Sequence, residues 1–374
     1  LRRSTCGQTA LTPRFLDNYV KPYTKNARKA DKTTKMTNLE LIAKLAGVSR
    51  GTVDRVLHNR GQVRPETEEK VRAVMQELDF QPNALGRAFY LSRKKNKIGI
   101  LVAFREPDFQ KQVMQGVNEG VVYAQQHGVE VLIEYAHPDD TEGYLASLRR
   151  LLDGGVRGLA IRGVLSDEID RCLREISREQ MQIVVYNEDI RDKGLRDCFV
   201  GQDSCRAGAC AACLMEQIAG PGGEMLLVGV DARHVSSEER LNGFAEYFRK
   251  RGTDVSHVIY GKGSHELTYR QTRDMIAARE HISGIFVSGA GLSGAAHAVD
   301  DAGLTGRIKV VGFDITESNM SFLKKGTVQF LIDQGPYMQG YRSVQLLTEA
   351  IFRDTPVETS FVDTGIQIKN PYNC

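Results

Sequence analysis

The 374-residue sequence contains 41% hydrophobic and 26% charged residues, which is ordinary for a globular protein and enough chain for two or three domains. No run of eighteen apolar residues and no signal-peptide pattern occurs, so we expect no membrane span and a cytoplasmic location. The seven cysteines form no disulfide framework. Because the eight histidines are scattered and GxSxG, HExxH and phosphate-loop motifs are missing, the sequence does not indicate an enzyme.

The formal net charge of +3 is unevenly distributed along the chain. Residues 1–36 carry 9 Lys and Arg against 2 Asp and Glu, residues 37–97 carry 12 against 7, and residues 98–374 carry 29 against 38. A basic first part followed by an acidic body fits a chain whose first part contacts phosphates. Residues 1–36 lack apolar periodicity, and we expect a disordered or non-native leader, with a basic DNA-binding arm as the alternative.

Residues 37–59 have the pattern of two short helices joined by a tight turn. Thr37 and Glu40 form a capping box that predicts the start of the first helix. Gly47 stands where a helix C-terminus favours a residue that tolerates positive φ. Ser49 is the expected cap of the second helix. The pattern is that of an ordinary capped helical hairpin or of a helix-turn-helix.

A third amphipathic helix, which Pro65 begins, favours the helix-turn-helix because it can close a core over the first two helices. In such motifs the early residues of the second helix contact base edges in the major groove, and Arg50 and Arg55 are the candidates for this role. The DNA-contacting residues predicted in this motif are Ser49, Arg50, Gly51, Thr52, Asp54 and Arg55.

From Ile98 onward, short apolar runs alternate with amphipathic stretches. The runs expected to form strands are residues 98–103, 129–134, 158–163, 181–187, 223–229, 256–261, 284–289 and 308–314. This alternation predicts an α/β body with parallel sheets, arranged in two similar lobes. In sheets of this kind ligands bind beyond the carboxyl ends of the strands, so residues just after the strands are the candidates for a binding site.

The segments AGVSRGTVDRVLH and VRPETEEKVRAVMQELDFQPNALGRA, with the strand IGILV that follows, closely resemble the lactose/galactose repressor family of bacterial transcription regulators. The resemblance covers residues 37 to about 370. It implies an all-α helix-turn-helix head over residues 37–81, a hinge helix and linker over residues 82–97, and a two-lobed body over residues 98–374 that is similar to a periplasmic sugar-binding protein.

In this family the hinge helix inserts an apolar side chain into the minor groove, and Phe89 matches that position. Asn83 and Arg87 of the same segment are further expected DNA contacts. The partner implied is a palindromic double-stranded operator. Because the sequence ends soon after its last strand without a heptad tail, a homodimer is expected.

The resemblance also implies three crossings between the lobes, which we place near Phe199, Leu331 and Arg353. The first lobe would then hold about residues 98–199 and 332–352, and the second about residues 200–331 and 353–374.

Effector-binding residues follow from the same resemblance. They are Phe109, Arg162 and Asn187 in the first lobe and Arg240, Asp314 and Gln334 in the second. Such groups supply donors, acceptors and a ring for a small sugar, polyol, sugar acid or sugar phosphate. Where the family usually has an Asn-Asp pair, this chain has Ser288, Gly289 and Ala290, so one side-chain contact to the effector is missing. No cofactor and no metal are expected.

Two other patterns suggest different functions. The sequence GAGLSG at residues 289–294, with Asp314 about twenty residues further on, matches a dinucleotide fingerprint and makes an NAD(H)-sensing regulator or an oxidoreductase the alternative function. Cys205, Cys210 and Cys213 have a spacing reminiscent of an iron–sulfur site. They lie in an Ala- and Gly-rich run typical of a tightly packed helix, where free cysteine serves as a small apolar residue.

Overall fold

The computed structural model describes residues 38–57, 63–77, 96–178, 181–220, 222–252, 255 and 257–374. The chain divides into two compact units, Leu1–Pro82 and Asn83–Cys374. Among the described residues no helix is both long and apolar enough to cross a membrane.

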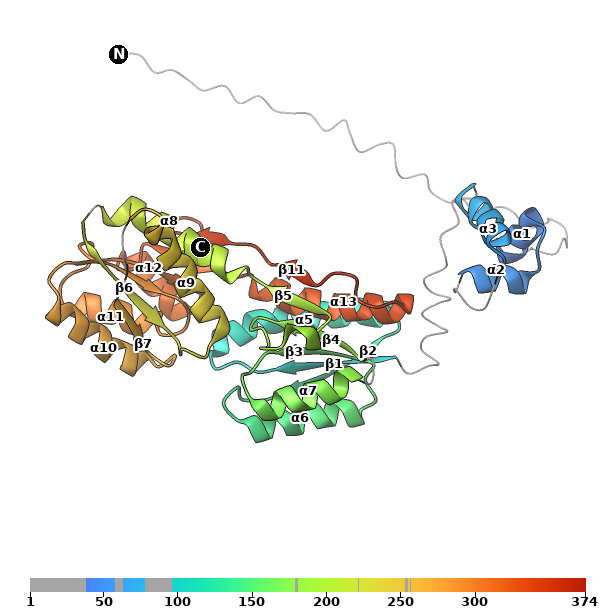
Figure 1. Ribbon diagram of the computed structural model, residues 1–374, viewed down its shortest axis with the longest axis horizontal. Helices are drawn as coiled ribbons and strands as arrows, with labels where there is room; N and C mark the ends of the chain where they lie inside the picture. Colours follow the sequence, from blue (N-terminus) through green and yellow to red (C-terminus); the bar gives the residue numbers. More distant parts are fainter. Residues whose placement is uncertain are drawn as a thin grey trace, which may run out of the picture. The chain divides into compact units, whose positions relative to one another are not determined.

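The described part of the first unit consists of three helices (Figure 1): α1 (Asn38–Ala46), α2 (Arg50–Leu57) and α3 (Pro65–Glu77). Gly47 follows α1 with a φ of 66°, as predicted for this helix end. The hydroxyl of Ser49 accepts a hydrogen bond from the backbone N–H of Thr52 at 3.1 Å, which is the predicted cap of α2. The expected helix-turn-helix with a third helix is therefore confirmed.

A small apolar core holds these helices together. Ile42 of α1, Val53 of α2 and Val71 of α3 are each fully buried in it. Helices this short are not stable by themselves, so the shared core stabilises them. Thr37 of the expected capping box, the leader over residues 1–36 and most of the hinge segment lie outside the described residues.

The first lobe of the second unit is built on a six-stranded sheet with the order β11-β5-β4-β3-β1-β2. Its strands are β1 (Lys97–Val102), β2 (Glu130–Tyr135), β3 (Gly158–Arg162), β4 (Gln182–Tyr186), β5 (Cys198–Gly201) and β11 (Phe361–Asp363), all paired in parallel. A short 3-10 helix, Lys193–Leu195, lies between β4 and β5.

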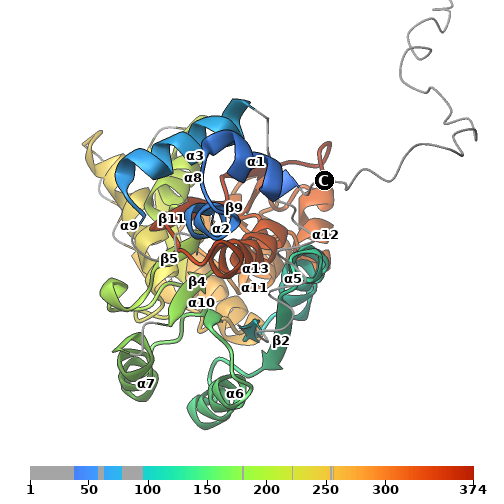
Figure 2. The ribbon, with the colours of Figure 1, turned by 90° about the vertical axis from the view of Figure 1, so that its right-hand side faces the viewer.

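Helices cover both faces of this sheet (Figure 1, Figure 2). One face carries α5 (Pro107–Gln126) and α13 (Pro336–Arg353), and the other carries α6 (Thr141–Asp153) and α7 (Asp167–Arg178). Because side chains alternate along a strand, Ile100 and Val102 pack under α5 and α13 while Leu101 packs under α6 and α7.

The second lobe repeats this plan with the order β12-β10-β9-β8-β6-β7. Its strands are β6 (Glu224–Gly229), β7 (His257–Tyr260), β8 (Ile282–Val287), β9 (Lys309–Phe313), β10 (Phe330–Asp333) and β12 (Gln367–Lys369). One face packs on α8 (Ser204–Ala219) and α9 (Val235–Arg249), and the other on α10 (His265–Ala278), α11 (Leu292–Asp301) and α12 (Glu317–Lys325). The α/β class with parallel sheets is confirmed, although the edge strand β12 runs antiparallel to β10.

The chain passes between the lobes three times, after β5, after β10 and after β11. The first two crossings fall close to the predicted positions near Phe199 and Leu331, since β5 ends at Gly201 and β10 at Asp333, whereas the third was predicted near Arg353. The third prediction is wrong by a whole strand. Arg353 ends α13, which packs on the first lobe, and β11 still pairs with β5 in the first sheet. The residues between Arg353 and the end of β11 thus belong with the first lobe.

Side chains bond the three crossing segments to one another. The amide of Gln202 donates to the backbone oxygens of Asp333, at 3.3 Å, and Gly365, at 3.0 Å. The hydroxyl of Thr364 donates to the backbone oxygen of Gln334 at 2.7 Å. Gln334 is therefore part of the hinge as well as a predicted effector contact.

Candidate functional site

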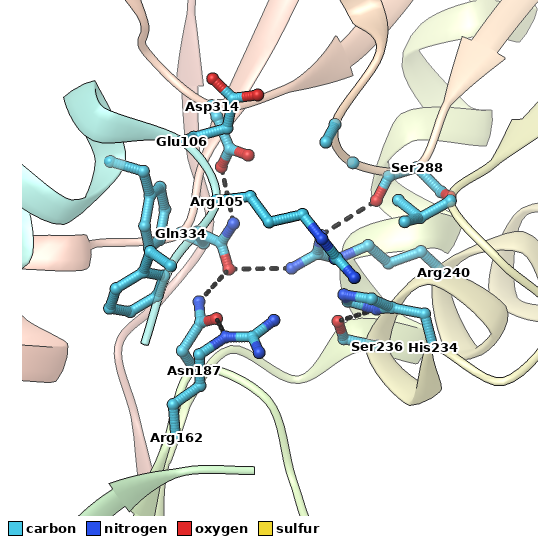
Figure 3. A pocket seen from close by; sticks show the side chains of 15 residues that line it. Arg105, Glu106, Arg162, Asn187, His234, Ser236, Arg240, Ser288, Asp314 and Gln334 are labelled. Atoms are coloured by element: carbon cyan, nitrogen blue, oxygen red, sulfur yellow. Dashed lines mark hydrogen bonds between the residues drawn. The ribbon is translucent and has the colours of Figure 1, made fainter. Parts of the chain in front are cut away.

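The six predicted effector contacts line a single cavity between the two lobes (Figure 3): Phe109, Arg162, Asn187, Arg240, Asp314 and Gln334. Several of the other lining residues directly follow strands of the two sheets, which is where ligands bind in folds of this kind. The geometry brings the six side chains together, and their role in binding stays a prediction.

Asn187 and Asp314 occupy matching positions in the two lobes. Each follows the third strand from one end of its sheet, β4 or β9, and each has a positive φ, 64° for Asn187 and 74° for Asp314. Their backbone N–H groups donate at 3.1 Å to Val200 and Ile332 of the neighbouring strands. Asn and Asp tolerate this left-handed conformation better than most residues, and such strain is concentrated at functional sites.

The amide of Gln334 connects both lobes (Figure 3). Its Nε2 donates to Asp314 Oδ1 at 2.6 Å, and its Oε1 accepts from Arg240 Nη2 at 3.0 Å. Asn187 Nδ2 of the first lobe lies 3.5 Å from the same Oε1. Asn187 Oδ1 in turn accepts from Arg162 Nε at 3.1 Å. Because arginine only donates, the two guanidinium groups determine the orientation of both amides.

Aromatic rings lie against these polar groups. The rings of Phe104 and Phe109 are 5.2 Å apart between centroids, and the guanidinium carbon of Arg162 is 5.6 Å from the Phe104 ring. The guanidinium carbon of Arg240 lies 4.0 Å from the ring of Phe313. A cation is attracted to the face of an aromatic ring, and an apolar wall of the cavity suits the apolar face of a sugar.

Burial shifts the pKa of the charged groups in the cavity. It raises the pKa of the Asp314 carboxyl, although Arg240 and the hydrogen bond from Gln334 act in the opposite direction. It lowers the pKa of the guanidinium groups of Arg162 and Arg240. Both shifts mean that the charged forms are held in the cavity at a cost in free energy.

Nine further lining residues were not among the predicted contacts: Phe104, Arg105, Glu106, Val230, His234, Ser236, Ser288, Gly289 and Ala290. Phe104 and Val230 follow β1 and β6 closely, so the strand-end rule could have found them. His234 and Ser236 begin α9 after a turn, and no local pattern marks them. At the position where the family's Asn-Asp pair is missing, the backbone oxygen of Ser288 accepts from Arg240 Nη1 at 3.0 Å.

In the first unit, five of the six predicted DNA contacts are exposed: Ser49, Arg50, Gly51, Asp54 and Arg55. Thr52 is half-buried, and its hydroxyl lies 2.9 Å from that of Ser49. Arg55 Nε donates to the backbone oxygen of Gly51 at 3.2 Å, so its side chain follows the helix. Asn83, Arg87 and Phe89 lie outside the described residues.

Two family profiles match the chain. Residues 98–353 match the profile described as a periplasmic binding protein domain, and residues 38–83 match that of bacterial regulatory proteins of the lacI family. The chain therefore combines a lacI-family DNA-binding head with a body that belongs to the periplasmic binding protein family. It is a DNA-binding transcription regulator whose body has the fold of a periplasmic binding protein.

Relatives of this lacI-family regulator cover most of its length. The ribose operon repressor of Halalkalibacterium halodurans is 25% identical over 87% of this chain and 93% of its own length. The lactose operon repressor of Escherichia coli is 25% identical over 82% of this chain and 83% of its own length. Both relatives are repressors by name.

Solved structures of binding proteins share the fold of the body. AraP, an arabinose binding protein from Geobacillus stearothermophilus, superposes with a TM-score of 0.65 at 21% identity, covering 74% of this chain and 98% of that chain. A solute binding protein from Agrobacterium vitis bound with α-D-tagatopyranose has a TM-score of 0.67 at 19% identity, covering 75% of this chain and 96% of that chain.

The dinucleotide alternative is not favoured, because the relatives are repressors and the glycines of the GAGLSG segment have packing roles. Gly291 precedes α11 with a φ of 105°. A Cβ atom at Gly294 would lie 2.3 Å from the backbone oxygen of His265 in α10. Gly289 lines the cavity between the lobes. Close packing of α10 and α11 thus accounts for much of the fingerprint.

The cysteine-rich helix α8 packs through its alanines, and two of its three cysteines are exposed while Cys210 is half-buried. Ala207, Ala211 and Ala212 are fully buried, whereas Cys205 and Cys213 are exposed. The expectation that these cysteines serve as small core residues is therefore wrong for Cys205 and Cys213. Among the described residues no group of three or more His, Cys, Asp or Glu could hold a metal ion.

Proposed function

We propose that this regulator is a repressor that binds a palindromic double-stranded operator as a homodimer, in the cytoplasm, and that a small polyhydroxylated effector in the cavity between the lobes controls its affinity for the operator. Sugars, polyols, sugar acids and sugar phosphates are the candidate effectors. The protein carries out no catalysis.

One observation supports the proposed binding of an effector in the cavity between the lobes. Polar side chains from both lobes line one cavity, and Gln334, which contacts three of them, also stands in the hinge between the lobes. A ligand that bonds to Gln334 must rearrange these contacts. A change at the cavity can therefore alter the relative position of the lobes, which is the kind of two-state element that allostery requires.

The exposed face of α2 supports the proposed binding to an operator. Arg50 and Arg55 lie on it, close to the helix N-terminus and one turn further on. Arginine reads guanine in the major groove through two parallel hydrogen bonds. A two-fold symmetric dimer presents two such helices, so the operator is expected to contain two half-sites related by the same symmetry.

The test begins with selection of operator sequences from a random pool by the full chain. A compound screen by thermal shift then identifies the effector, because a ligand that binds only the folded state raises the melting temperature. Asp314→Ala should abolish the response of operator binding to that effector, since a buried acceptor of hydroxyl groups is lost, and should leave operator binding without effector unchanged. Failure of the selection to enrich a palindrome would contradict the proposed function.

A further inference from the structure

Two arginines from opposite lobes end in the same cavity. Arg162 is the last residue of β3 in the first lobe, and Arg240 lies in α9 of the second lobe. Their guanidinium groups reach the centre of the cavity from different sides (Figure 3). Arg162 is 8% exposed and Arg240 is 4% exposed. Arginine is almost never buried to this degree unless its charge is paired.

The hydrogen-bond partners of both guanidinium groups are neutral. Arg162 donates to the side-chain oxygen of Asn187 at 3.1 Å and to the backbone oxygen of the next residue at 3.3 Å. Arg240 donates to Gln334 Oε1 and to the backbone oxygen of Ser288, both at 3.0 Å, and its buried Nε has no partner. Among the described residues, no carboxylate accepts a hydrogen bond from either arginine.

Two carboxylates that act electrostatically on the arginines, Asp314 and Glu188, accept hydrogen bonds from other groups. Asp314 Oδ1 accepts from Gln334 at 2.6 Å, and Glu188 accepts from the backbone N–H and the hydroxyl of Ser236. Burial lowers the pKa of both guanidinium groups more than these carboxylates raise it. Arg105 and Glu106 also line the cavity and carry opposite charges. In the described part of the chain, Asp314 is then the one remaining carboxylate that lines the cavity with Arg162 and Arg240. Because arginine remains protonated, protein groups do not fully compensate these two positive charges.

We propose that the effector carries an anionic group, a carboxylate or a phosphate, which lies between Arg162 and Arg240. This inference rests on the proposed function of the cavity and names the chemical class of its ligand. The guanidinium group matches the oxygens of both anions with two parallel hydrogen bonds. Hydroxyl groups elsewhere on the effector donate to Asp314 and accept from Asn187.

The proposed position of the anion also links binding to closure of the lobes. The two guanidinium groups belong to different lobes, so without an anion their like charges oppose closure. An anion between them attracts both and holds the lobes together. A neutral sugar of the same shape can accept hydrogen bonds from the arginines but cannot compensate their charge.

Calorimetry on the full chain with matched ligands tests the inference at constant ionic strength. Each series contains a neutral sugar and its charged derivatives: D-glucose with D-glucuronate and D-glucose 6-phosphate, D-galactose with D-galacturonate, and D-ribose with D-ribose 5-phosphate. We expect at least one charged compound to bind about tenfold or more tightly than its neutral parent. This comparison uses the wild-type protein and does not depend on the folding of any variant.

Substitutions test whether the two arginines cause the tighter binding of the charged compound. Arg162→Gln and Arg240→Gln should each weaken binding of the charged compound by about tenfold or more, while the difference between the charged compound and its neutral parent disappears. Arg162→Lys keeps the charge but not the two parallel hydrogen bonds, and should give an intermediate loss. Arg273→Gln is the matched control, because Arg273 is exposed on α10 and pairs with Asp274.

Two results would overturn the inference. One is that, in every series, the neutral parent binds as tightly as its charged derivatives, and the other is the failure of all charged compounds to bind. Either result leaves the proposed regulator intact if the same preparation selects a palindromic operator. Loss of operator selection, with anion binding retained, would instead contradict the proposed function and leave the anion site standing.

Discussion

The carboxylate of Glu188 in the first lobe accepts two hydrogen bonds from Ser236 in the second lobe, from the backbone N–H at 3.1 Å and from the hydroxyl at 2.5 Å. Ser236 lies in the first turn of α9, where backbone N–H groups lack partners within the helix and where the helix dipole favours an anion. Burial alone would raise the pKa of Glu188, but His234, Arg162 and the bonds from Ser236 outweigh it and hold this pKa below its ordinary value.

Removal of the Glu188 carboxylate should destabilise the body. In Glu188→Ala the buried N–H and hydroxyl of Ser236 lose their acceptor, which is expected to lower the free energy of unfolding by about 1 to 3 kcal/mol. Urea denaturation measures this difference. Glu358→Ala is the control, because Glu358 is exposed and its loss should change the free energy by no more than about 0.5 kcal/mol. Equal effects of the two substitutions would show that the contact between the lobes does not contribute to stability.

The stability of the body should fall as the pH is lowered from 6.5 to 4. Burial lowers the pKa of His234 to about 4, while the unfolded chain takes up this proton near pH 6.5. Since the unfolded state binds the proton first, the contribution of the neutral imidazole is complete above pH 6.5 and is lost on acidification. The loss between pH 7.5 and pH 5 is expected to be on the order of 1 to 2 kcal/mol.

Denaturation curves at several pH values check this dependence in wild type and in His234→Gln. The variant should lose less stability over that interval, and His281→Gln, which changes an exposed histidine, should behave like wild type. The contribution of Glu188 is separable, because its lowered pKa means that its stabilisation is lost only at still lower pH. If the stability of His234→Gln falls with decreasing pH as steeply as that of wild type, His234 is not the source of the pH dependence.

Replacement of Gln334 should uncouple the cavity from the hinge. Gln334→Ala removes the acceptor for Arg240 and Asn187 and the donor to Asp314, so effector affinity should fall by about tenfold or more. Operator binding without effector should be retained. Calorimetry and gel-shift titration measure the two quantities separately.

Gln345→Ala is the matched control for Gln334→Ala. The amide of Gln345 bonds to Arg342 and Glu349 within the same helix, α13, and does not line the cavity. Effector affinity should therefore be unchanged in this variant. If Gln334→Ala also binds the effector as wild type does, Gln334 has no part in the site.

Arg55 should determine one base pair in each half-site. Arg55→Ala is expected to relax the preference at that position and to cost about 1 to 3 kcal/mol of binding free energy. Operator selection with wild type and variant compares the two consensus sequences. Arg72→Ala, on α3, removes an exposed arginine that pairs with Glu68 and should leave the consensus unchanged. An identical consensus for Arg55→Ala would show that Arg55 does not read a base.

Local patterns in the sequence predicted the structural features that depend on a few neighbouring residues, such as the ends of helices. Gly47 and Ser49 mark the ends of two helices because their backbone and side-chain preferences act within one helical turn. The family resemblance named Asn187 and Asp314, and both directly follow strands, as the strand-end rule expects, because a buried parallel strand is a continuous apolar run and its last residue is visible in the sequence. The third crossing was misplaced because β11 is only three residues long, Phe361–Asp363, and leaves little pattern.

Only the tertiary structure decided which hydrogen-bond donors and acceptors pair with one another across the lobes. Glu188 and Ser236 are far apart in the sequence, and nothing near either residue indicates that one accepts from the other. The same holds for Arg240, whose acceptor at the position of the missing Asn-Asp pair is a backbone oxygen that any residue would supply. The sequence by itself determined the helix-turn-helix, the α/β class and the residues at the ends of the strands, because propensity and periodicity are local. Hydrogen bonds between distant segments depend on how two lobes meet, and that geometry exists only in the folded chain.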